Sequence, residues 1–560
     1  MPLSRTQASR YAVLSLAIAA LLLPIAWIEH SVLQYTHGVM TYPLDDTFIH
    51  MAVAKNLAFE KVWGITRYSF ESASSSLLYT ILLAATFSVF GAHVIIPLVI
   101  NLLAAILLLA ILQQWLIRQG LSLLNQFFVL LAVIYLTPLP VLVISGMEHT
   151  LQFLFCFLFI SSFSAAAARA TPAINGVAVP ATTDRTAAPA APAGATAGKL
   201  PWQVYLYGLL MVATRYESLA IIGLAGLILL VQRRWMAVLW LGLISIAPVV
   251  LFGLISLSKG SYLLPNSVLL KSGAPPLTFA GLSYFFTHVF FQKLFFPTQG
   301  YNLMAAQRLL LILPVFYLLF LGTLRRHPKY RNMLLILMGA TLAHLAFSFY
   351  CAYPRYEAYL IGCSTVILCA IAAKHGREVL AGELGKAVWL TAALLFTLAA
   401  PVGFRAIASF RLAGQACENV YDQQYQMARF VHQYYNNTPL AFNDIGAISY
   451  FSDGQKLDLY GIGSIEVAKS KKQNTWTAGW ADSLSKRDRI KIAIVYDSWF
   501  WPALLHHWSK IASWRIYNNV GAAEDSVSFY AVDTAGGLLL RKNLQAWQPS
   551  LPKGVGVRIY

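Results

Sequence analysis

Long, uninterrupted apolar runs separated by short polar stretches dominate most of the chain. Clear examples are Tyr11–Trp27, Ile95–Trp115, Phe127–Ile144 and Trp235–Leu257. An α-helix rises about 1.5 Å per residue, so each run is long enough to cross roughly 30 Å of hydrocarbon. Membrane-spanning strands would need short segments of alternating apolar and polar positions, and such segments are not seen. The pattern therefore predicts a polytopic α-helical membrane protein.

The basic residues indicate how the apolar runs are threaded through the membrane, because Lys and Arg gather in cytoplasmic loops. The clusters are Arg5 with Arg10, Arg118, Arg169, Arg233 with Arg234, Arg325 to Lys329, and Lys374 to Arg377. With all of them on one side, about eleven spans follow. They lie near 11–28, 93–117, 121–143, 150–168, 202–217, 218–232, 236–257, 308–324, 332–350, 356–373 and 387–404.

The apolar segment Leu77–Phe90 does not fit this threading as a span, because it would move Arg118 to the outer side. The segment is also short for a span. We therefore expect a re-entrant or interfacial helix on the outer face, within a first external loop at 29–92.

Two further regions depart from the membrane pattern. Residues 165–200 are rich in Ala, Pro and Thr without an apolar period, which predicts a disordered cytoplasmic linker. From about residue 410 the composition turns polar and mixed, and short apolar runs alternate with helix-like stretches. The runs are Leu440–Phe442, Lys456–Tyr460, Ile490–Tyr496, Trp514–Tyr517 and Val527–Val532. We expect a membrane domain at 1–409 and a small extracytoplasmic α/β domain at 410–560.

Composition agrees with this class: 58% of residues are hydrophobic and only 11% are charged. The net charge of +18 fits cytoplasmic loops and anionic lipid headgroups rather than nucleic acid. The five cysteines show neither metal-ligand spacing nor a disulfide framework. A Walker loop, a dinucleotide fingerprint, a His-Glu-x-x-His motif and a Gly-x-Ser-x-Gly elbow are all missing from the sequence, so ATP use, NAD chemistry and serine hydrolysis lack support.

Charged residues are costly near a bilayer, so their clusters mark candidate sites. The threading places every unusual polar cluster on the outer side, where all of them can share one crevice. The clusters are Asp45-Asp46, Ser145-Gly-Met-Glu-His149, Arg215-Tyr-Glu217, Leu264-Pro-Asn-Ser-Val-Leu-Leu-Lys271 and Tyr353-Pro-Arg-Tyr-Glu357.

The adjacent acids Asp45 and Asp46 begin a helix-like stretch. One interpretation is an N-cap, in which an Asp accepts hydrogen bonds from the first N–H groups of that helix. A cap needs one acid, however, and a second adjacent carboxylate needs a cation, a proton or a substrate to hold. The other interpretation is a general base acting on an acceptor hydroxyl; Asp45 is favoured, and the choice between the two stays open. His50 shares the face of Asp46 and could assist it, ligate a metal or form a local hydrogen bond.

The remaining clusters each have a structural and a functional interpretation. Glu148 and His149 are either a membrane-surface pair with side chains reaching the interface or part of a site. Arg215 with Glu217 forms either a local ion pair or a phosphate grip, and Arg355 with Glu357 repeats the pattern. Both Arg–Glu pairs stand at turns between apolar runs.

The cluster Leu264–Lys271 contains two polar candidates for substrate binding. Asn266 precedes Lys271, which is either a further phosphate-binding cation or an ordinary interfacial lysine.

Taken in order, these motifs resemble those of the polytopic GT-C glycosyltransferases, in particular bacterial members related to the mycobacterial arabinofuranosyltransferase that adds terminal arabinose. The motifs are Leu44-Asp-Asp-Thr-Phe-Ile-His50, Ser74-Ser-Ser-Leu-Leu-Tyr79, Gly146-Met-Glu148, Arg215-Tyr-Glu217, Leu264-Pro-Asn-Ser267 with Lys271, and Arg355-Tyr356. The chain departs from the family pattern twice: Ser76 or Leu77 stands where Pro is common, and Tyr216 stands where Pro is expected.

The resemblance implies inverting transfer of a sugar from a polyprenyl-phosphate donor to a glycan or lipid acceptor, at the periplasmic face of a bacterial inner membrane. Asp45 or Asp46 would be the catalytic base. The substrate-binding residues would be His50, Glu148, His149, Arg215, Glu217, Asn266, Lys271, Arg355 and Tyr356. Members with and without a divalent cation exist, and the sequence does not decide between them; no metal ligands are assigned.

Two alternatives use the same residues differently. A transporter or lipid-handling protein without catalysis would favour internal repeats and charges at mid-membrane, which are not seen. A membrane-anchored glycan-binding protein would place its function in the tail, for example on the aromatic residues Trp499 to Trp501 around Asp497, which otherwise pack in a core.

Overall fold

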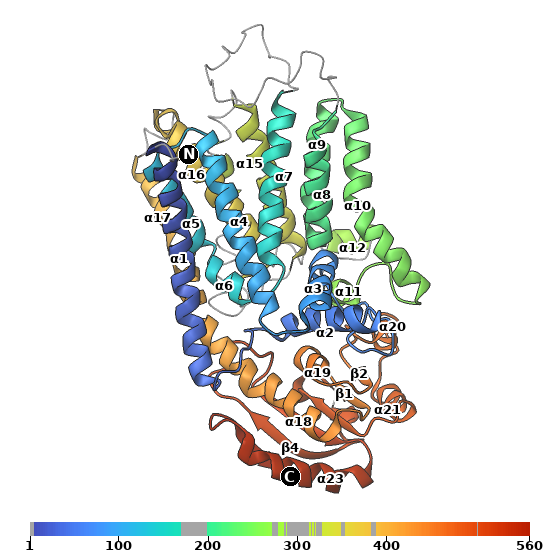
Figure 1. Cartoon of the computed structure of the whole chain (residues 1–560). Coiled ribbons are helices and arrows are strands. Elements are labelled where there is room, and N and C mark those ends of the chain that lie inside the picture. The colour runs from blue at the N-terminus through green and yellow to red at the C-terminus, as the bar shows by residue number, and fades with distance from the viewer. Residues whose placement is uncertain are drawn as a thin grey trace.

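The chain folds into a helical bundle with a smaller sheet-containing domain against one end of it (Figure 1). The computed structural model describes residues 5–169, 199–271, 278–284, 287, 313–314, 316–318, 320, 327–348, 353–381, 388–500 and 502–560. The N-terminal end lies near the bundle end far from the sheet, and the C-terminal end lies in the sheet domain (Figure 1).

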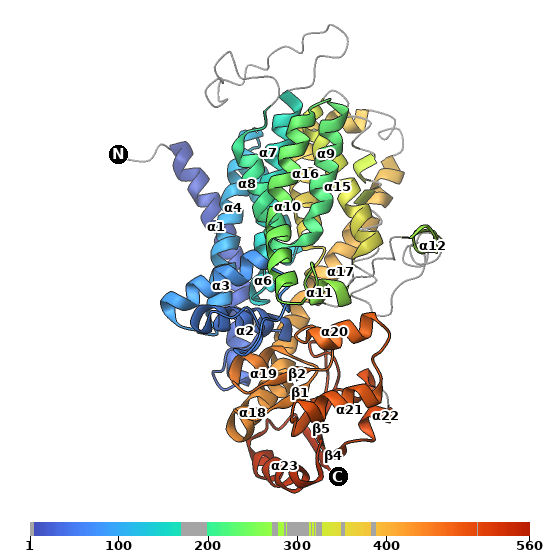
Figure 2. The same cartoon turned by 90° about the vertical axis from the view of Figure 1, so that its right-hand side faces the viewer.

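The bundle is built from long apolar helices that run roughly side by side (Figures 1 and 2). They are α1 (Arg5–Tyr35), α4 (Ile96–Arg118), α5 (Leu123–Leu136), α7 (His149–Arg169), α8 (Trp202–Thr214), α9 (Leu219–Val231), α10 (Trp235–Ser258), α15 (Pro328–Phe347), α16 (Ala358–Ala381) and α17 (Val388–Val420). Six helices of the described residues are long and apolar enough to cross a membrane. Large apolar side chains such as Leu103, Trp240 and Leu251 stay exposed on this bundle, which suits contact with lipid. The helical membrane fold is confirmed.

One predicted span is interrupted. The single helix expected at 121–143 is two helices, α5 and α6 (Leu139–Ile144), with a break at Pro138, whose φ is +24°. A proline has no N–H to continue the helical ladder, and Pro140 follows two residues later. The expected span at 308–324 and the linker at 165–200 lie largely outside the described residues.

Two short helices lie across the end of the bundle that faces the sheet domain (Figures 1 and 2). They are α2 (Asp45–Glu60) and α3 (Leu77–Phe90), which pack against each other. Ser76 caps α3 by accepting a hydrogen bond from the N–H of Tyr79 at 3.3 Å, so this turn forms without a proline. The place of α3 is the one that an interfacial helix requires.

The sheet domain is a mixed α/β fold, as expected. Its strands are β1 (Leu440–Phe442), β2 (Lys456–Asp458), β3 (Ile492–Val495), β4 (Ser509–Arg515), β5 (Ser526–Ala531) and β6 (Gly556–Ile559), in the order β2-β1-β3-β5-β4-β6. The β1–β2 and β1–β3 pairs are parallel and the other pairs are antiparallel. The helices are α18 (Gln426–Tyr435), α19 (Gly446–Phe451), α20 (Ile465–Lys472), α21 (Ala478–Arg487), α22 (Pro502–Leu505) and α23 (Thr534–Trp547).

A continuous backbone path joins the two parts. Helix α17 crosses position 410 without a break and passes through a five-residue π-helical segment, Tyr421–Tyr425, into α18. The expected boundary at 410 therefore falls inside a helix.

The basic clusters gather at the bundle end away from the sheet. Lys329 donates to the side chain of Gln119 at 2.8 Å, the rings of His327 and His375 lie 4.3 Å apart, and Gln232 donates to the carbonyl of Ala167 at 3.1 Å. These contacts join the ends of α4, α7, α9, α15 and α16, so the basic loops share one end. The polar clusters meet at the opposite end, beside α2.

Candidate active site

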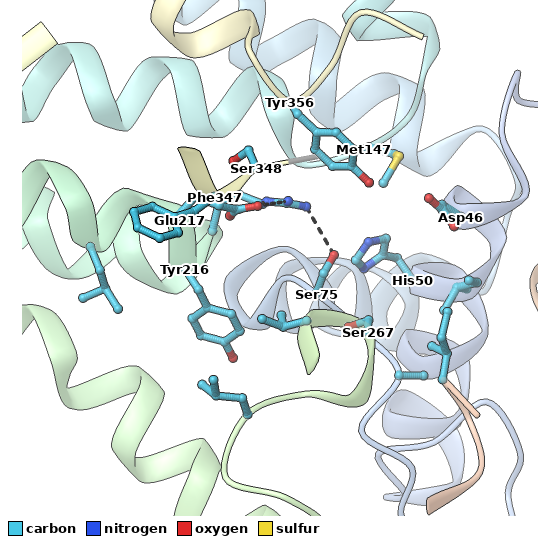
Figure 3. Close-up of a pocket in the computed structure, with 17 residues that line it drawn as sticks. Asp46, His50, Ser75, Met147, Tyr216, Glu217, Ser267, Phe347, Ser348 and Tyr356 are labelled. Atoms are coloured by element: carbon cyan, nitrogen blue, oxygen red, sulfur yellow. Dashed lines mark hydrogen bonds and ion pairs between the residues drawn. The ribbon is translucent and has the colours of Figure 1, made fainter. Parts of the chain in front are cut away.

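A cavity of about 340 Å³ lies where the bundle, α2 and the sheet domain meet. Figure 3 shows its lining, in which Asp46, His50 and Ser75 face Met147, Tyr356 and Glu217. Apolar side chains make up much of the remaining wall, and a few polar groups converge on it. A mostly apolar pocket with few polar groups is typical of a small-molecule site.

Asp46 is the carboxylate that reaches this pocket. It lines the cavity, and its side chain is 24% exposed. Its Oδ2 lies 2.8 Å from Nη2 of Arg355, whose Nη1 lies 3.0 Å from the sulfur of Met147. An arginine at this distance favours the ionised carboxylate, which is the form that accepts a proton.

Asp45 turns away from the pocket toward the sheet domain. Its carboxylate accepts hydrogen bonds from the backbone N–H groups of Gly446 at 2.5 Å and Ala447 at 2.7 Å. The expected capping role is therefore found at another helix: the N-cap of α2 is Leu44, which makes no side-chain cap bond, and Asp45 instead caps α19. Burial and the neighbouring Asp444 raise the pKa of Asp45 well above its ordinary value.

A chain of buried charges runs behind the pocket wall. Nη1 of Arg215 lies 2.8 Å from Oε1 of Glu148, and the same guanidinium pairs with Glu217. Oε2 of Glu148 lies 3.3 Å from Nε2 of His50. Glu148 and His149 have no exposed surface, so the interpretation of a membrane-surface pair is wrong for them. Their burial requires partners, which His50 and Arg215 supply to Glu148.

The electrostatics of this chain follow from burial and pairing. Burial alone would raise the pKa of Glu148, but the attraction of His50, Arg215 and His149 outweighs it and holds the pKa well below its usual range. Burial lowers the pKa of His50, against the opposing effect of Glu148 and Asp46. His50 also contacts the hydroxyl of Ser74 through Nδ1 at 3.0 Å, which fixes the ring. Of the roles predicted for His50, the local hydrogen bond is present, with Ser74; the ring also pairs with Glu148 and lines the cavity.

Two guanidinium groups share one aromatic ring beside the pocket. The guanidinium carbon of Arg355 lies 4.7 Å from the ring centre of Tyr356, and that of Arg215 lies 5.2 Å from it. The ring of His149 packs edge-on against Tyr356 at 5.6 Å. The predicted convergence of the two arginine-bearing turns is therefore observed, and it brings two planar cations close to one cavity wall.

Glu357 does not belong to this group. It pairs with Arg405 of α17, with Oε1 at 2.7 Å from Nη2 and 3.0 Å from Nε, and both side chains are buried. The expected repeat of the Arg215–Glu217 pattern at Arg355–Glu357 is therefore wrong. Arg405 escapes sequence reasoning because it stands in a mostly apolar helix with no motif around it.

The Leu-Pro-Asn segment closes another side of the pocket, where Leu264 and Ser267 line the cavity. Asn266 is a structural link instead: its backbone N–H donates to Ser72 O at 3.0 Å, and its side-chain amide donates to Ile462 O at 3.3 Å. Helix α11 (Asn266–Lys271) follows, and the side chain of Lys271 lies outside the described residues.

A tight turn positions Glu148. Gly146 has φ of +62°, and a Cβ atom there would collide with the ring of Tyr42 and approach Thr47 to 2.9 Å. Thr47 donates to Ser145 O at 2.7 Å and Tyr79 donates to Gly146 O at 2.6 Å. Only glycine fits this turn, which sets Met147 and Glu148 against α2.

Sequence reasoning did not single out several lining residues, among them Ser75, Met147 and Ile462. Ser75 and Met147 lie inside quoted motifs but carry no charge that would single them out. Ile462 comes from the sheet domain, and nothing in its surroundings in the sequence marks it. Within the part of the chain that the structure describes, no three His, Cys, Asp or Glu side chains gather as metal ligands would.

Comparison with solved structures places this arrangement in a known fold. The chain is similar to ArnT from Cupriavidus metallidurans, solved with bound undecaprenyl phosphate, with a TM-score of 0.50 and 14% identity over 93% of this chain and 98% of ArnT. The chain has the GT-C glycosyltransferase fold. An oligosaccharyltransferase from Archaeoglobus fulgidus, solved in the apo form, matches with a TM-score of 0.44 and 11% identity over 94% of this chain and 74% of its own.

Within this GT-C fold, residues 418–530 match a family model described as a domain of unknown function, DUF8728. The match covers most of the sheet domain, including α19 and Ile462. No curated protein matches the chain by sequence.

Proposed function

We propose that the chain is an inverting glycosyltransferase that moves a sugar from a polyprenyl-phosphate donor to an acceptor hydroxyl. One observation carries the proposal: the carboxylate of Asp46, paired with Arg355, lines a pocket flanked by the guanidinium groups of Arg215 and Arg355. A base for the acceptor and cations for a phosphate leaving group are the two requirements of this reaction.

Asp46 is the base in this proposal, because the Asp45 carboxylate is already engaged by α19. The acceptor hydroxyl gives its proton to a carboxylate oxygen of Asp46 while its oxygen bonds to the anomeric carbon. The bond from that carbon to the phosphate oxygen breaks on the opposite face, and the electron pair stays on the phosphate. Arg215 and Arg355 stabilise the charge that develops there.

The same threading supports a location. Basic loops at the far end of the bundle favour the cytoplasmic side, which puts the pocket and the sheet domain on the outer face of a bacterial cytoplasmic membrane. With the pocket at the outer face, the apolar tail of a donor lies in the bilayer, and the phosphate of the donor reaches Arg215 and Arg355. The donor in this proposal carries a pentose or a hexose, and the acceptor is a glycan or a lipid.

The test compares Asp46→Asn with Asp525→Asn, an exposed acid of the sheet domain that serves as the control. Both full-length variants are reconstituted in proteoliposomes with radiolabelled polyprenyl-phosphate pentoses and hexoses and with envelope glycan extract. We expect Asp46→Asn to lower transfer at least about 100-fold, since general-base catalysis contributes about that much. Binding of undecaprenyl phosphate to Asp46→Asn should persist, because the arginines remain.

Transfer by Asp46→Asn at the wild-type rate would overturn the assignment of the base. Solute flux without sugar transfer in the same proteoliposomes would favour a transporter. Mass analysis of envelope glycans from cells with and without the protein then identifies the product.

A further inference from the structure

Arg405 of α17 lies where three elements of the bundle meet. Its guanidinium pairs with Oε1 of Glu357, at 2.7 Å from Nη2 and 3.0 Å from Nε, just before α16 begins. Its remaining nitrogen, Nη1, donates to the carbonyl of Leu136, the last residue of α5, at 3.4 Å. Both charged side chains are almost fully buried, with 2% of Arg405 and 1% of Glu357 exposed. The guanidinium group therefore joins α5, α16 and α17 at one point.

The carbonyl of Leu136 needs a donor from outside its own helix. In a continuous helix it would accept the N–H of the residue four positions later, but that residue is Pro140, which has no N–H. A helix carbonyl without a donor is costly inside a membrane bundle, and Arg405 supplies the missing bond. Arg405 thus stabilises the break between α5 and α6, and α6 leads into the turn that carries Met147.

Glu357 depends on Arg405 for its pairing. Its Oε2 is buried and has no hydrogen-bond partner among the residues that the structure describes, and both Arg405 bonds go to Oε1. Loss of Arg405 would leave this carboxylate buried without its cation, two residues after Arg355. Burial of an unpaired charge is strongly unfavourable, so the turn that carries Arg355 and Glu357 would have to move.

The same turn carries the cation that faces the proposed base. Arg355 pairs with Asp46 at 2.8 Å. The other end of the turn is held by α6, because the hydroxyl of Tyr353 donates to the carbonyl of Val141 at 2.9 Å. Tyr353 and Glu357 therefore fix the backbone on both sides of Arg355, and Arg405 supports both attachments.

We propose that Arg405 is a positioning residue for the proposed transfer: it holds the turn of Glu357 against the break after Leu136, so that Arg355 stays beside Asp46 and faces the phosphate of the donor. The proposal rests on the proposed function for the phosphate and on the three hydrogen bonds of Arg405 for the geometry. A buried ion pair adds little stability over apolar side chains of similar volume. What this pair supplies is the orientation of the turn.

The decisive variant replaces both charges, Glu357→Met with Arg405→Met, because it removes the three hydrogen bonds without leaving a buried unpaired charge. We expect its Tm in detergent to stay close to the wild-type value, since apolar replacement of a buried ion pair is often neutral. Its affinity for undecaprenyl phosphate, titrated by native mass spectrometry, should still fall at least about 10-fold, because a hydrogen bond to a charged group contributes about that factor or more.

Arg411→Met is the matched control, because it makes the same substitution at an exposed position of the same helix. Its Tm and its affinity for undecaprenyl phosphate should match wild type.

Two further measurements separate a positioning role from a merely structural one. In proteoliposomes, the double variant should raise the KM for the polyprenyl-phosphate donor at least about 10-fold. A merely structural role would lower the amount of active protein, which reduces the apparent kcat and leaves KM unchanged. Hydrogen exchange of the lipid-free chain should increase at residues 353–357 and 139–147 and stay at the wild-type level in α10.

Wild-type affinity in a folded double variant, or unchanged exchange at residues 353–357, would overturn the proposal. If the double variant does not fold, Arg405→Lys replaces it: a lysine keeps the charge beside Glu357 but lacks the planar fork that also reaches Leu136. We expect the same directions of change for Arg405→Lys, and wild-type affinity overturns the proposal equally.

Hydrogen exchange needs neither donor nor transfer, so it distinguishes failure of this proposal from failure of the proposed function. Increased exchange at residues 353–357 in the double variant, with no sugar transfer by wild type, removes the proposed function and leaves the structural role of Arg405. Transfer that is lost in Asp46→Asn but kept at the wild-type KM in the double variant removes the role of Arg405 alone.

Discussion

The adjacent acids at the start of α2 take different roles because successive helical residues point about 100° apart. Asp46 faces the pocket and Arg355, whereas Asp45 faces α19. The scarcity of charge is enough to mark both residues in the sequence. The division between them depends on Gly446 and Ala447, which lie about 400 positions away along the chain, so no local pattern contains it.

For the buried charged residues behind the pocket, too, the sequence marks the residues but not their partners. His50, Glu148 and Arg215 stand out in the sequence because each is polar at the edge of an apolar run. Their contacts with one another are tertiary, as is the pairing of Glu357 with Arg405, and sequence spacing pointed to the wrong partner for Glu357. The residues that matter were predictable here from their type, and the identity of each partner was not.

Removal of the Glu148 charge should be far more costly than removal of a surface charge. Glu148→Gln leaves Arg215 buried with one carboxylate fewer, and we expect a loss of about 3 kcal/mol in the free energy of unfolding. Glu466→Gln is the control, since Glu466 also pairs with an arginine, Arg487, but both side chains are about half exposed. The control should cost below about 1 kcal/mol. Thermal unfolding in detergent measures both, and equal losses would contradict the buried network.

At the scale of elements, periodicity and composition predicted most helices and the strands β1, β2, β3 and β5, whereas the predicted run Trp514–Tyr517 overlaps β4 at only two residues. The break between α5 and α6 was missed because apolar residues continue across Pro138, although the proline itself was visible. Strand β6 (Gly556–Ile559) was missed, and it is its pairing with β4 that defines it. The sequence distinguishes helix α3 from the membrane spans because the segment is short and because a span there would move Arg118 to the outer side.

The turn before α7 offers a test of how elements set the site. Gly146→Ala forces a side chain into a left-handed conformation and against Tyr42, so we expect a loss of about 1–3 kcal/mol and a higher KM for the donor, because Met147 and Glu148 shift. Gly223→Ala in α9 is the control: its Cβ meets open space, and Ala suits a helix interior better than Gly. A matching effect of the two substitutions on Tm and KM would show that the turn does not position Glu148.

At the scale of the whole molecule, the bundle, α2 and the sheet domain make a single site. The pocket takes lining residues from the first loop, from the ends of the bundle helices and from Ile462 of the sheet domain. The α17–α18 connection carries no turn that would act as a flexible linker, and the contacts of Asp45 and Asn266 with the domain tie its other side to the bundle end. The domain of unknown function is therefore expected to act as part of the proposed enzyme rather than as an independent binding module.

Gly446→Ala tests this coupling. The added methyl group would collide with the Asp45 backbone and carboxylate, so the sheet domain must move away from α2 or Asp45 must turn. Either response displaces Asp46, and we expect transfer to fall at least about 10-fold, because a misplacement of about 1 Å can cost more than that. Hydrogen exchange at residues 45–60 should increase, while exchange in α4 and α7 stays at the wild-type level.

Gly479→Ala is the matched control for this substitution. It lies in α21 of the same domain, and its Cβ meets nothing within 4 Å. Exchange and transfer should therefore match wild type. If Gly446→Ala also left both unchanged, the domain would be shown to dock without influence on Asp46, and Asp46 would have to owe its orientation to Arg355 and the bundle alone.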